Sequence, residues 1–153
     1  MTTYLVRHAK AGDRSQWDGP DDLRPLSKVG RRQAVGLVKQ LDGAPIEHVV
    51  TSPYVRCRQT VEPLAEQRRL AVDLADELIE GALVGDALRL IDKFAYTDAV
   101  LCTHGDVLGN VLENLERRGV PLGNIKKLEK GCTWVLEFGD GEIVSGKHVP
   151  APK

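Results

Sequence analysis

Two histidines in this sequence directly follow short apolar runs. Residues 4–6 lead into Arg7 and His8, and residues 99–103 lead into His104. An uncharged imidazole nitrogen is a nucleophile that can attack phosphorus, and a guanidinium can bind two oxygens of a phosphate dianion at once. These residue types predict chemistry on a phosphoryl group.

The two apolar runs have the length and composition of buried strands. Both are short, rich in residues with high β propensity and bounded by polar residues. In an open α/β sheet, ligands bind at the carboxyl ends of the strands. We therefore expect His8 and His104 to lie at one edge of a sheet, within reach of one ligand atom.

A second arginine, Arg56, is predicted to lie near the start of a helix. Residues 46–51 are typical of a strand, and Ser52-Pro53 is typical of an N-cap followed by the first residue of a helix that runs to about Gln67. The helix dipole and the free backbone N–H groups at such an end favour an anion. Arg58, two positions later, is expected to point away from that end and lie on the surface.

The remaining pattern alternates strands with helices. We expect helices from Ser27 to Gly43, from Gly85 to about Phe94 and from Gly105 to Gly119, and strands at 70–74, 132–138 and 143–149 with a hairpin turn at 139–141. This order predicts a single α/β domain over residues 1–153. Its sheet is doubly wound and mostly parallel, with helices on both faces and an antiparallel C-terminal hairpin.

Residues 10–24 form a polar stretch that we expect to be a loop over the carboxyl edge of the sheet. Lys10, Arg14 and Arg24 are candidates to face an anion there. A solvated charged loop is the simpler explanation for any one of them.

Composition limits the kinds of partner. The chain has 153 residues and a formal net charge of −1, so its overall field does not attract nucleic acid or an anionic membrane surface. The three cysteines, Cys57, Cys102 and Cys132, form no CxxC pair, and no apolar run approaches the roughly 20 residues that span a bilayer. With no signal peptide in the sequence, we expect a cytoplasmic protein without membrane or nucleic-acid partners. Its oligomeric state is left open.

Four motifs occur in an order that resembles the histidine phosphatase superfamily, also called the phosphoglycerate mutase-like superfamily. They are Leu5-Val6-Arg7-His8-Ala9, Leu26-Ser27-x-x-Gly30-x-x-Gln33-Ala34, Ser52-Pro53-x-x-Arg56-x-x-Gln59-Thr60 and Thr103-His104-Gly105. The resemblance implies that His8 is the phosphorylated nucleophile. It also implies that Arg7, Arg56 and His104 complete the phosphate-binding site.

The short chain, the Arg-His-Ala-Lys variant and the Arg24-Pro25-Leu26 segment resemble the bacterial phosphohistidine phosphatase branch. This resemblance implies a phosphatase that acts through phosphohistidine on His8, with phosphohistidine on a signalling protein as the expected substrate. The alternative is a phosphomonoesterase for a small phosphorylated metabolite, such as a nucleotide or a sugar phosphate.

The general acid is less clearly defined by the sequence. Leu78-x-Glu80 resembles the Leu-x-Glu of the mutase and phosphatase branches, so we rank Glu80 above Glu77 and Asp106 as the candidate acid. The short branch, in contrast, often has no obvious acid at this place.

Rival functions have less support. The sequence contains no HxxxH or HxH pair of the kind that binds a metal in hydrolases, so we expect metal-independent catalysis without a cofactor. A phosphate-binding module without turnover would not need His8. His48 and His148 have no charged company in the sequence pattern and are interpreted as structural.

Overall fold

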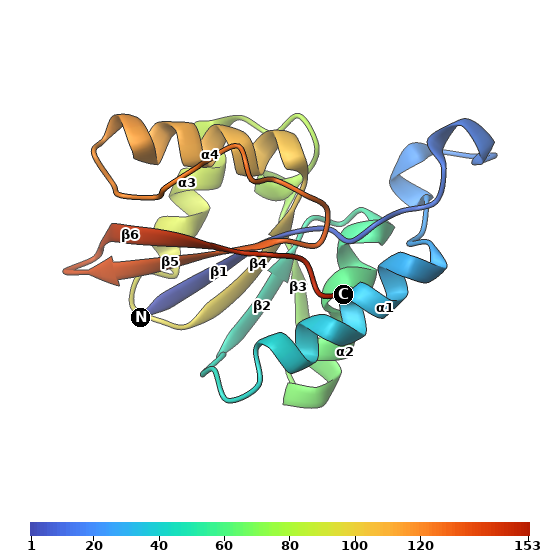
Figure 1. The fold of residues 1–153 in the computed structure, drawn as a ribbon, viewed down its shortest axis with the longest axis horizontal. Coiled ribbons are helices and arrows are strands. Elements are labelled where there is room, and N and C mark those ends of the chain that lie inside the picture. The colour runs from blue at the N-terminus through green and yellow to red at the C-terminus, as the bar shows by residue number, and fades with distance from the viewer.

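The computed structural model describes all 153 residues and contains one six-stranded sheet (Figure 1). The strands are β1 (Thr2–Arg7), β2 (His48–Thr51), β3 (Val72–Leu74), β4 (Ala99–Thr103), β5 (Thr133–Gly139) and β6 (Glu142–Val149), in the order β3-β2-β4-β1-β5-β6. The four strands β3, β2, β4 and β1 are parallel, and β5 and β6 add antiparallel pairs at one edge. The predicted mostly parallel sheet with a C-terminal hairpin is confirmed.

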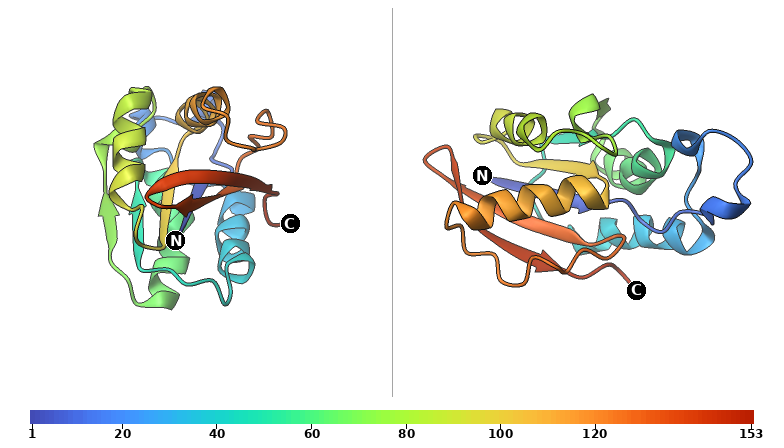
Figure 2. Two further views of the ribbon diagram at one scale, coloured as in Figure 1. Left: turned by 90° about the vertical axis from the view of Figure 1, so that its left-hand side faces the viewer. Right: turned by 90° about the horizontal axis from the view of Figure 1, so that it is seen from above.

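Helices cover both faces of the sheet, as predicted (Figure 2). Helices α1 (Lys28–Gln40) and α2 (Val55–Arg68) lie on one face, and α3 (Val84–Lys93) and α4 (Gly105–Arg117) lie on the other. Each pair buries its own apolar cluster against the sheet. Short 3-10 turns occur at Arg14–Gln16, Asp21–Leu23 and Asp76–Leu78. None of the helices combines the length and the apolar character needed to cross a membrane.

The two histidine-bearing strands are neighbours in the sheet. Strands β1 and β4 pair in parallel with Arg7 opposite Thr103, and the backbone N–H of His8 donates to the carbonyl of Thr103 at 3.0 Å. The residues that follow each strand therefore emerge at the same edge. The prediction that His8 and His104 share this edge is confirmed.

The start of α2 differs from the prediction. The helix begins at Val55, with Tyr54 as its N-cap residue, and not at Ser52-Pro53. The Ser52 hydroxyl accepts the N–H of Tyr54 at 3.3 Å but also bonds His104, so it lies between the strand end and the site and does not cap a helix there. Arg56 still lies in the first turn of α2, and Arg58 is exposed, as predicted.

The loop after β1 is fixed to the start of α1. The N–H of Ser27 donates to the carbonyl of Lys10 at 2.9 Å, and a Cβ atom at Gly30 would lie 1.9 Å from the same carbonyl oxygen. Only glycine allows α1 to pack this closely against the segment that follows His8. The rest of the loop, up to Arg24, extends past the carboxyl edge of the sheet (Figure 1).

Candidate functional site

A cavity of about 790 Å³ opens at the carboxyl edge of the sheet. Its lining includes six cationic side chains, Arg7, Lys10, Arg14, Arg24, Arg56 and Lys130, and three acidic ones, Asp13, Glu80 and Asp106. The chain as a whole carries a formal net charge of −1. The positive charge is therefore concentrated locally, as anion binding at this edge requires.

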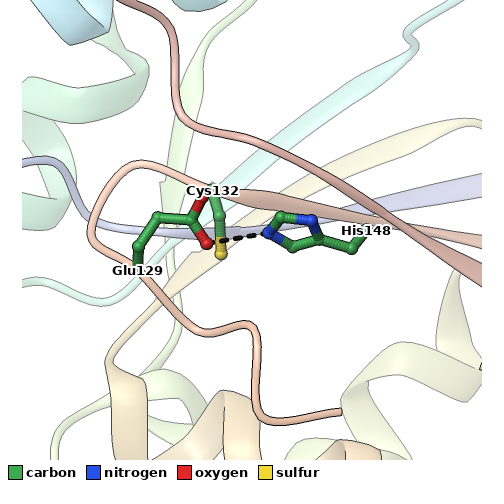
Figure 3. Close-up of side chains that lie close together, drawn as sticks. All are labelled: Glu129, Cys132 and His148. Atoms are coloured by element: carbon green, nitrogen blue, oxygen red, sulfur yellow. Dashed lines mark hydrogen bonds and ion pairs between the residues drawn. The ribbon is translucent and has the colours of Figure 1, made fainter. Parts of the chain in front are cut away.

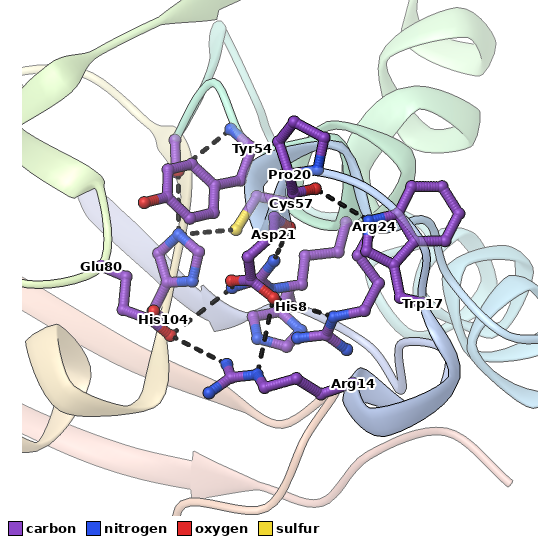
Figure 4. A network of polar contacts seen from close by, with 12 residues as sticks. His8, Arg14, Trp17, Pro20, Asp21, Arg24, Tyr54, Cys57, Glu80 and His104 are labelled. Carbon is purple, nitrogen blue, oxygen red and sulfur yellow. Dashed lines mark hydrogen bonds and ion pairs between the residues drawn. The ribbon is translucent and has the colours of Figure 1, made fainter.

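His8 lies in this cavity as a buried imidazole close to His104 (Figure 4). Its Nδ1 lies 2.7 Å from the carbonyl oxygen of Ala9. A carbonyl only accepts, so Nδ1 carries the proton and Nε2 keeps the lone pair. Burial lowers the pKa of His8 to about 3 despite the bond to Ala9, and the positive charges of Arg56 and Arg7 act in the same direction. A free lone pair on Nε2 at neutral pH is what a nucleophilic histidine requires.

The His104 ring packs beside His8 and also contacts Ser52 and Tyr54. The two ring centroids are 5.4 Å apart, and the Nε2 atom of His104 lies 2.9 Å from the hydroxyl of Ser52. The Tyr54 ring meets the His104 ring edge to face at 4.7 Å between centroids. The other ring nitrogen of His104, Nδ1, is buried and has no hydrogen-bond partner in the protein.

Arg7 lies against the start of α4. Its Nη1 donates to the carbonyl of Leu128 at 2.6 Å, while its Nε is buried without a partner. A Cβ atom at Gly105 would lie 2.7 Å from the guanidinium carbon, so the glycine after His104 gives Arg7 room at the N-terminus of that helix. The guanidinium and the helix dipole therefore act on the same place.

Arg56 is fully buried and has acidic partners on one side. It donates to the backbone carbonyl of Asp21 at 2.8 Å and to the Asp21 carboxylate at 3.1 Å, and its Nη2 lies 3.5 Å from a carboxylate oxygen of Glu80. The guanidinium also stacks over the Tyr54 ring at 4.9 Å. Its Nε has no partner.

Three buried nitrogens around His8 thus lack a hydrogen-bond partner: Arg7 Nε, Arg56 Nε and His104 Nδ1. Leaving a buried polar group unpaired costs about 1–3 kcal/mol. A tetrahedral anion has several acceptor oxygens and could pair with all three groups at once. The arrangement suits binding of a phosphoryl group next to the lone pair of His8.

The structure separates the three candidate acids. Glu80 lines the cavity, and its carboxylate lies 3.5 Å from Arg56 and 3.6 Å from Arg14. Asp106 also lines the cavity but accepts the backbone N–H of Gly81 at 2.8 Å. Glu77 lies in a different surface hollow. The sequence ranking of Glu80 first agrees with these placements, and its role as an acid stays a prediction.

The loop cations all reach the cavity. Lys10, Arg14 and Arg24 are part of its lining. Arg24 is buried and donates to the Asp21 carboxylate at 3.0 Å and to the carbonyl of Gly12 at 2.6 Å. The interpretation of a solvated charged loop is therefore wrong for Arg24.

Two residues of the site were missed by the sequence analysis. The Asp21 carboxylate lies within ion-pair distance of Arg14, Arg24 and Arg56. Burial raises the pKa of Asp21, but the hydrogen bond from Arg24 and the charge of Arg56 outweigh this and hold the pKa below its usual value. Lys130 comes from a segment without a recognisable motif, and burial together with the positive charge of Arg7 lowers its pKa. Nothing in the sequence distinguishes Asp21 from the other loop aspartates.

The fold and these donors define an α/β protein whose cavity presents unpaired cationic donors around a buried histidine. Residues 3–87 match the family model of the histidine phosphatase superfamily (branch 1). The chain belongs to this superfamily, as the four motifs led us to expect.

Known relatives agree with this assignment. The chain is 35% identical over 156 residues to an 8-oxo-(d)GTP phosphatase of Mycolicibacterium smegmatis; the match covers 99% of this chain and 48% of that protein, so the chain spans about half the relative's length. Its fold matches the protein histidine phosphatase SixA complexed with tungstate (TM-score 0.79, 19% identity, 100% and 97% of the two chains). It also matches SixA of Nakamurella multipartitia, a proposed phosphohistidine phosphatase (TM-score 0.71, 25% identity, 99% and 95%).

The lowered pKa of His8 predicts a specific loss of stability in acid. An unfolded histidine binds a proton near pH ~6.5, whereas folded His8 stays neutral down to about pH 3. Within this window the unfolded state binds one more proton than the folded state, so stability falls as the pH falls, by up to ~1.4 kcal/mol per pH unit from this group.

Urea unfolding of the wild-type protein and His8→Gln at several pH values across this window measures the effect. Because all other groups titrate in both proteins, the difference between their unfolding free energies should change with this slope. A difference that stays constant with pH would show that His8 is not held neutral.

Proposed function

We propose that this protein is a metal-independent phosphatase that forms a covalent phosphohistidine on His8. The observation that carries the proposal is the set of three unpartnered nitrogens, on Arg7, Arg56 and His104, around the neutral imidazole of His8. Membership of the histidine phosphatase superfamily supports it.

In the first step, Nε2 of His8 attacks phosphorus while the bond from phosphorus to the leaving oxygen breaks. Arg7, Arg56 and His104 bind the peripheral oxygens, where negative charge lies in the transition state. Glu80 acts as the general acid, gives a proton to the leaving oxygen and becomes a carboxylate.

In the second step, water attacks the phosphohistidine. The Glu80 carboxylate takes a proton from the water as the new P–O bond forms and the P–N bond breaks. Inorganic phosphate leaves, and His8 returns to its neutral form. The arginines and the imidazole supply the charge stabilisation, and converging guanidinium groups would repel a cation.

Two observations favour a nucleoside di- or triphosphate as the substrate. The rim offers more positive charge than one phosphoryl group uses, because Lys10 and Lys130 line the cavity and form no ion pair with the protein. The relative with 35% identity is an 8-oxo-(d)GTP phosphatase. We therefore place this class first.

Phosphohistidine on a signalling protein is the second candidate. It is the substrate expected from the short chain, and the likeness to the proposed phosphohistidine phosphatase SixA of Nakamurella multipartitia supports it. Both candidates use the same transfer to His8.

A substrate panel tests the proposal. Wild-type protein is assayed on nucleoside mono-, di- and triphosphates, sugar phosphates and a histidine-phosphorylated protein, beside His8→Ala and the control His48→Ala, since His48 contacts Phe94 and not the cavity. His8→Ala should lose at least about 10³-fold in kcat because the nucleophile is gone. His48→Ala should retain activity. A folded His8→Ala variant with near wild-type turnover would contradict the assignment of the nucleophile.

The role of Glu80 is tested by the leaving group. An alkyl phosphate releases a strongly basic oxygen, and a general acid contributes on the order of 10²–10⁴-fold, so Glu80→Gln should lose about that much on this substrate. The loss should be much smaller on phosphohistidine, because imidazole is a weaker base with a pKa of ~6.5. Glu77→Gln, outside the cavity, is the matched control. Equal losses on both substrates would contradict the argument, and no loss on either would show that Glu80 only pairs with the arginines.

A further inference from the structure

A second group of reactive side chains lies outside the cavity. Glu129, Cys132 and His148 each offer one metal-ligand atom, and these atoms lie within 4.8 Å of one another (Figure 3). His148 Nε2 and a Glu129 carboxylate oxygen are 2.8 Å apart. The sequence pattern pairs His148 with no acidic side chain, but the fold places the Glu129 carboxylate beside its ring. Thiolate, imidazole and carboxylate are the donors that Zn²⁺ takes in proteins.

Two of the three residues lie at the ends of one tight turn. The N–H of Cys132 donates to the carbonyl of Glu129 at 3.0 Å, and Gly131 between them has φ of +86°. This left-handed conformation favours glycine and lets the turn close. Paired ligands separated by two residues are a common spacing in structural zinc sites.

The third ligand comes from the neighbouring strand. His148 of β6 lies opposite Trp134 of β5, and Cys132 lies two residues before Trp134. The side chains of Cys132, Trp134 and His148 therefore lie on the same face of the sheet. The Trp134 and His148 rings are in edge contact with centroids 5.6 Å apart. The Glu129 carboxylate accepts the N–H of Ala151 at 3.4 Å. Such supporting contacts orient metal ligands.

The burial of the three side chains leaves one side open. Cys132 is buried, the His148 side chain is 13% exposed and that of Glu129 is 45% exposed. An ion can therefore enter from solvent and keep a water as its fourth ligand. Zn²⁺ bonds of about 2.0–2.3 Å place tetrahedral ligand atoms roughly 3.3–3.8 Å apart, so small side-chain rotations suffice.

We propose that Glu129, Cys132 and His148 bind one divalent cation of the Zn²⁺ class. On binding, the Cys132 thiol releases its proton to solvent as the metal–sulfur bond forms. In the free protein Nε2 of His148 carries the proton that it donates to the Glu129 carboxylate. On metal binding this hydrogen bond breaks, the Nε2 proton passes to solvent and Nδ1 takes up a proton, so that Nε2 donates its lone pair to the metal. Burial and the Glu129 charge raise the pKa of Cys132 to about 12, so the thiol is protonated until a metal displaces the proton.

A metal ion at this site links strand β6, through His148, to the turn at residues 129–132. None of its three ligands lines the cavity. The turn is nevertheless close to it, because Leu128 accepts from Arg7 and the N–H of Gly131 donates to the carbonyls of Arg7 and His8 at 3.2 and 3.0 Å. The bound ion therefore stabilises this region without taking part in phosphoryl transfer.

Cobalt titration tests the proposal independently of any substrate. Chelator-treated protein is titrated with Co²⁺, and we expect one equivalent to give thiolate charge-transfer absorption, the visible bands of a four-coordinate ion and release of protons. Zn²⁺ should displace Co²⁺ and raise the Tm. His148→Gln and Cys132→Ser should lose the absorption and the Tm increase, while His48→Gln keeps both. His148→Gln is the safer variant, because its side chain is partly exposed and Cys132 is in the core.

Three results would overturn the proposal. They are the absence of charge-transfer absorption in the wild-type protein, absorption that persists in folded His148→Gln, and an equal Zn²⁺-induced Tm increase in wild type and that variant. Phosphatase turnover well below the Tm should survive chelation. Turnover that is lost with chelator and restored by Zn²⁺ would show that the ion is not confined to this site.

Discussion

The proposed chemistry depends on one constraint, which is that the imidazole of His8 stays uncharged among cations. The bond from His8 Nδ1 to the Ala9 carbonyl fixes the ring and its tautomer, and burial with Arg7 and Arg56 nearby excludes a second proton. In the proposed mechanism, the same arginines that bind the phosphoryl group thus also keep the lone pair of His8 available. A histidine in water would be partly protonated near neutral pH.

The contacts around His8 explain the spacing of several polar residues in the motifs. The N–H of Ala9 donates to the Thr60 hydroxyl and that of Lys10 to the Gln33 side chain, both at 2.9 Å. Gln59 accepts the N–H of Leu26 at 2.8 Å. These side chains come from α1 and α2, so the two helices on one face of the sheet fix the backbone that follows the nucleophile. None of these three side chains lines the cavity.

The sequence predicted those parts of the site that depend on where strands and helices end. Arg7 ends a buried strand, His8 and His104 directly follow buried strands, and Arg56 lies in the first turn of a helix. Local pattern and sheet topology together therefore bring all four to one edge of the sheet. The predicted start of α2 was wrong because the Ser52 side chain bonds His104 and does not cap the helix. That choice depends on a contact between residues far apart in the chain.

The remaining parts depend on loops folding back. Asp21 reaches three arginines only because its loop turns over the cavity edge. Lys130 reaches the same cavity from the segment between α4 and β5, which contains none of the four motifs. Glu129 and His148 meet through the register of a hairpin. Residue types and local spacing carry no signal for such contacts, so only the folded chain reveals them.

The covalent intermediate tests the central claim most directly. The protein is mixed with a substrate that carries radioactive phosphorus on the transferable group, quenched in alkali within the first turnover and digested into peptides. We predict label on the peptide that contains His8, stable in alkali and lost in acid as a phosphorus–nitrogen bond is, and approaching one phosphoryl group per active chain. Label on another residue, or full turnover with no labelled peptide under conditions that preserve phosphohistidine, would contradict the account.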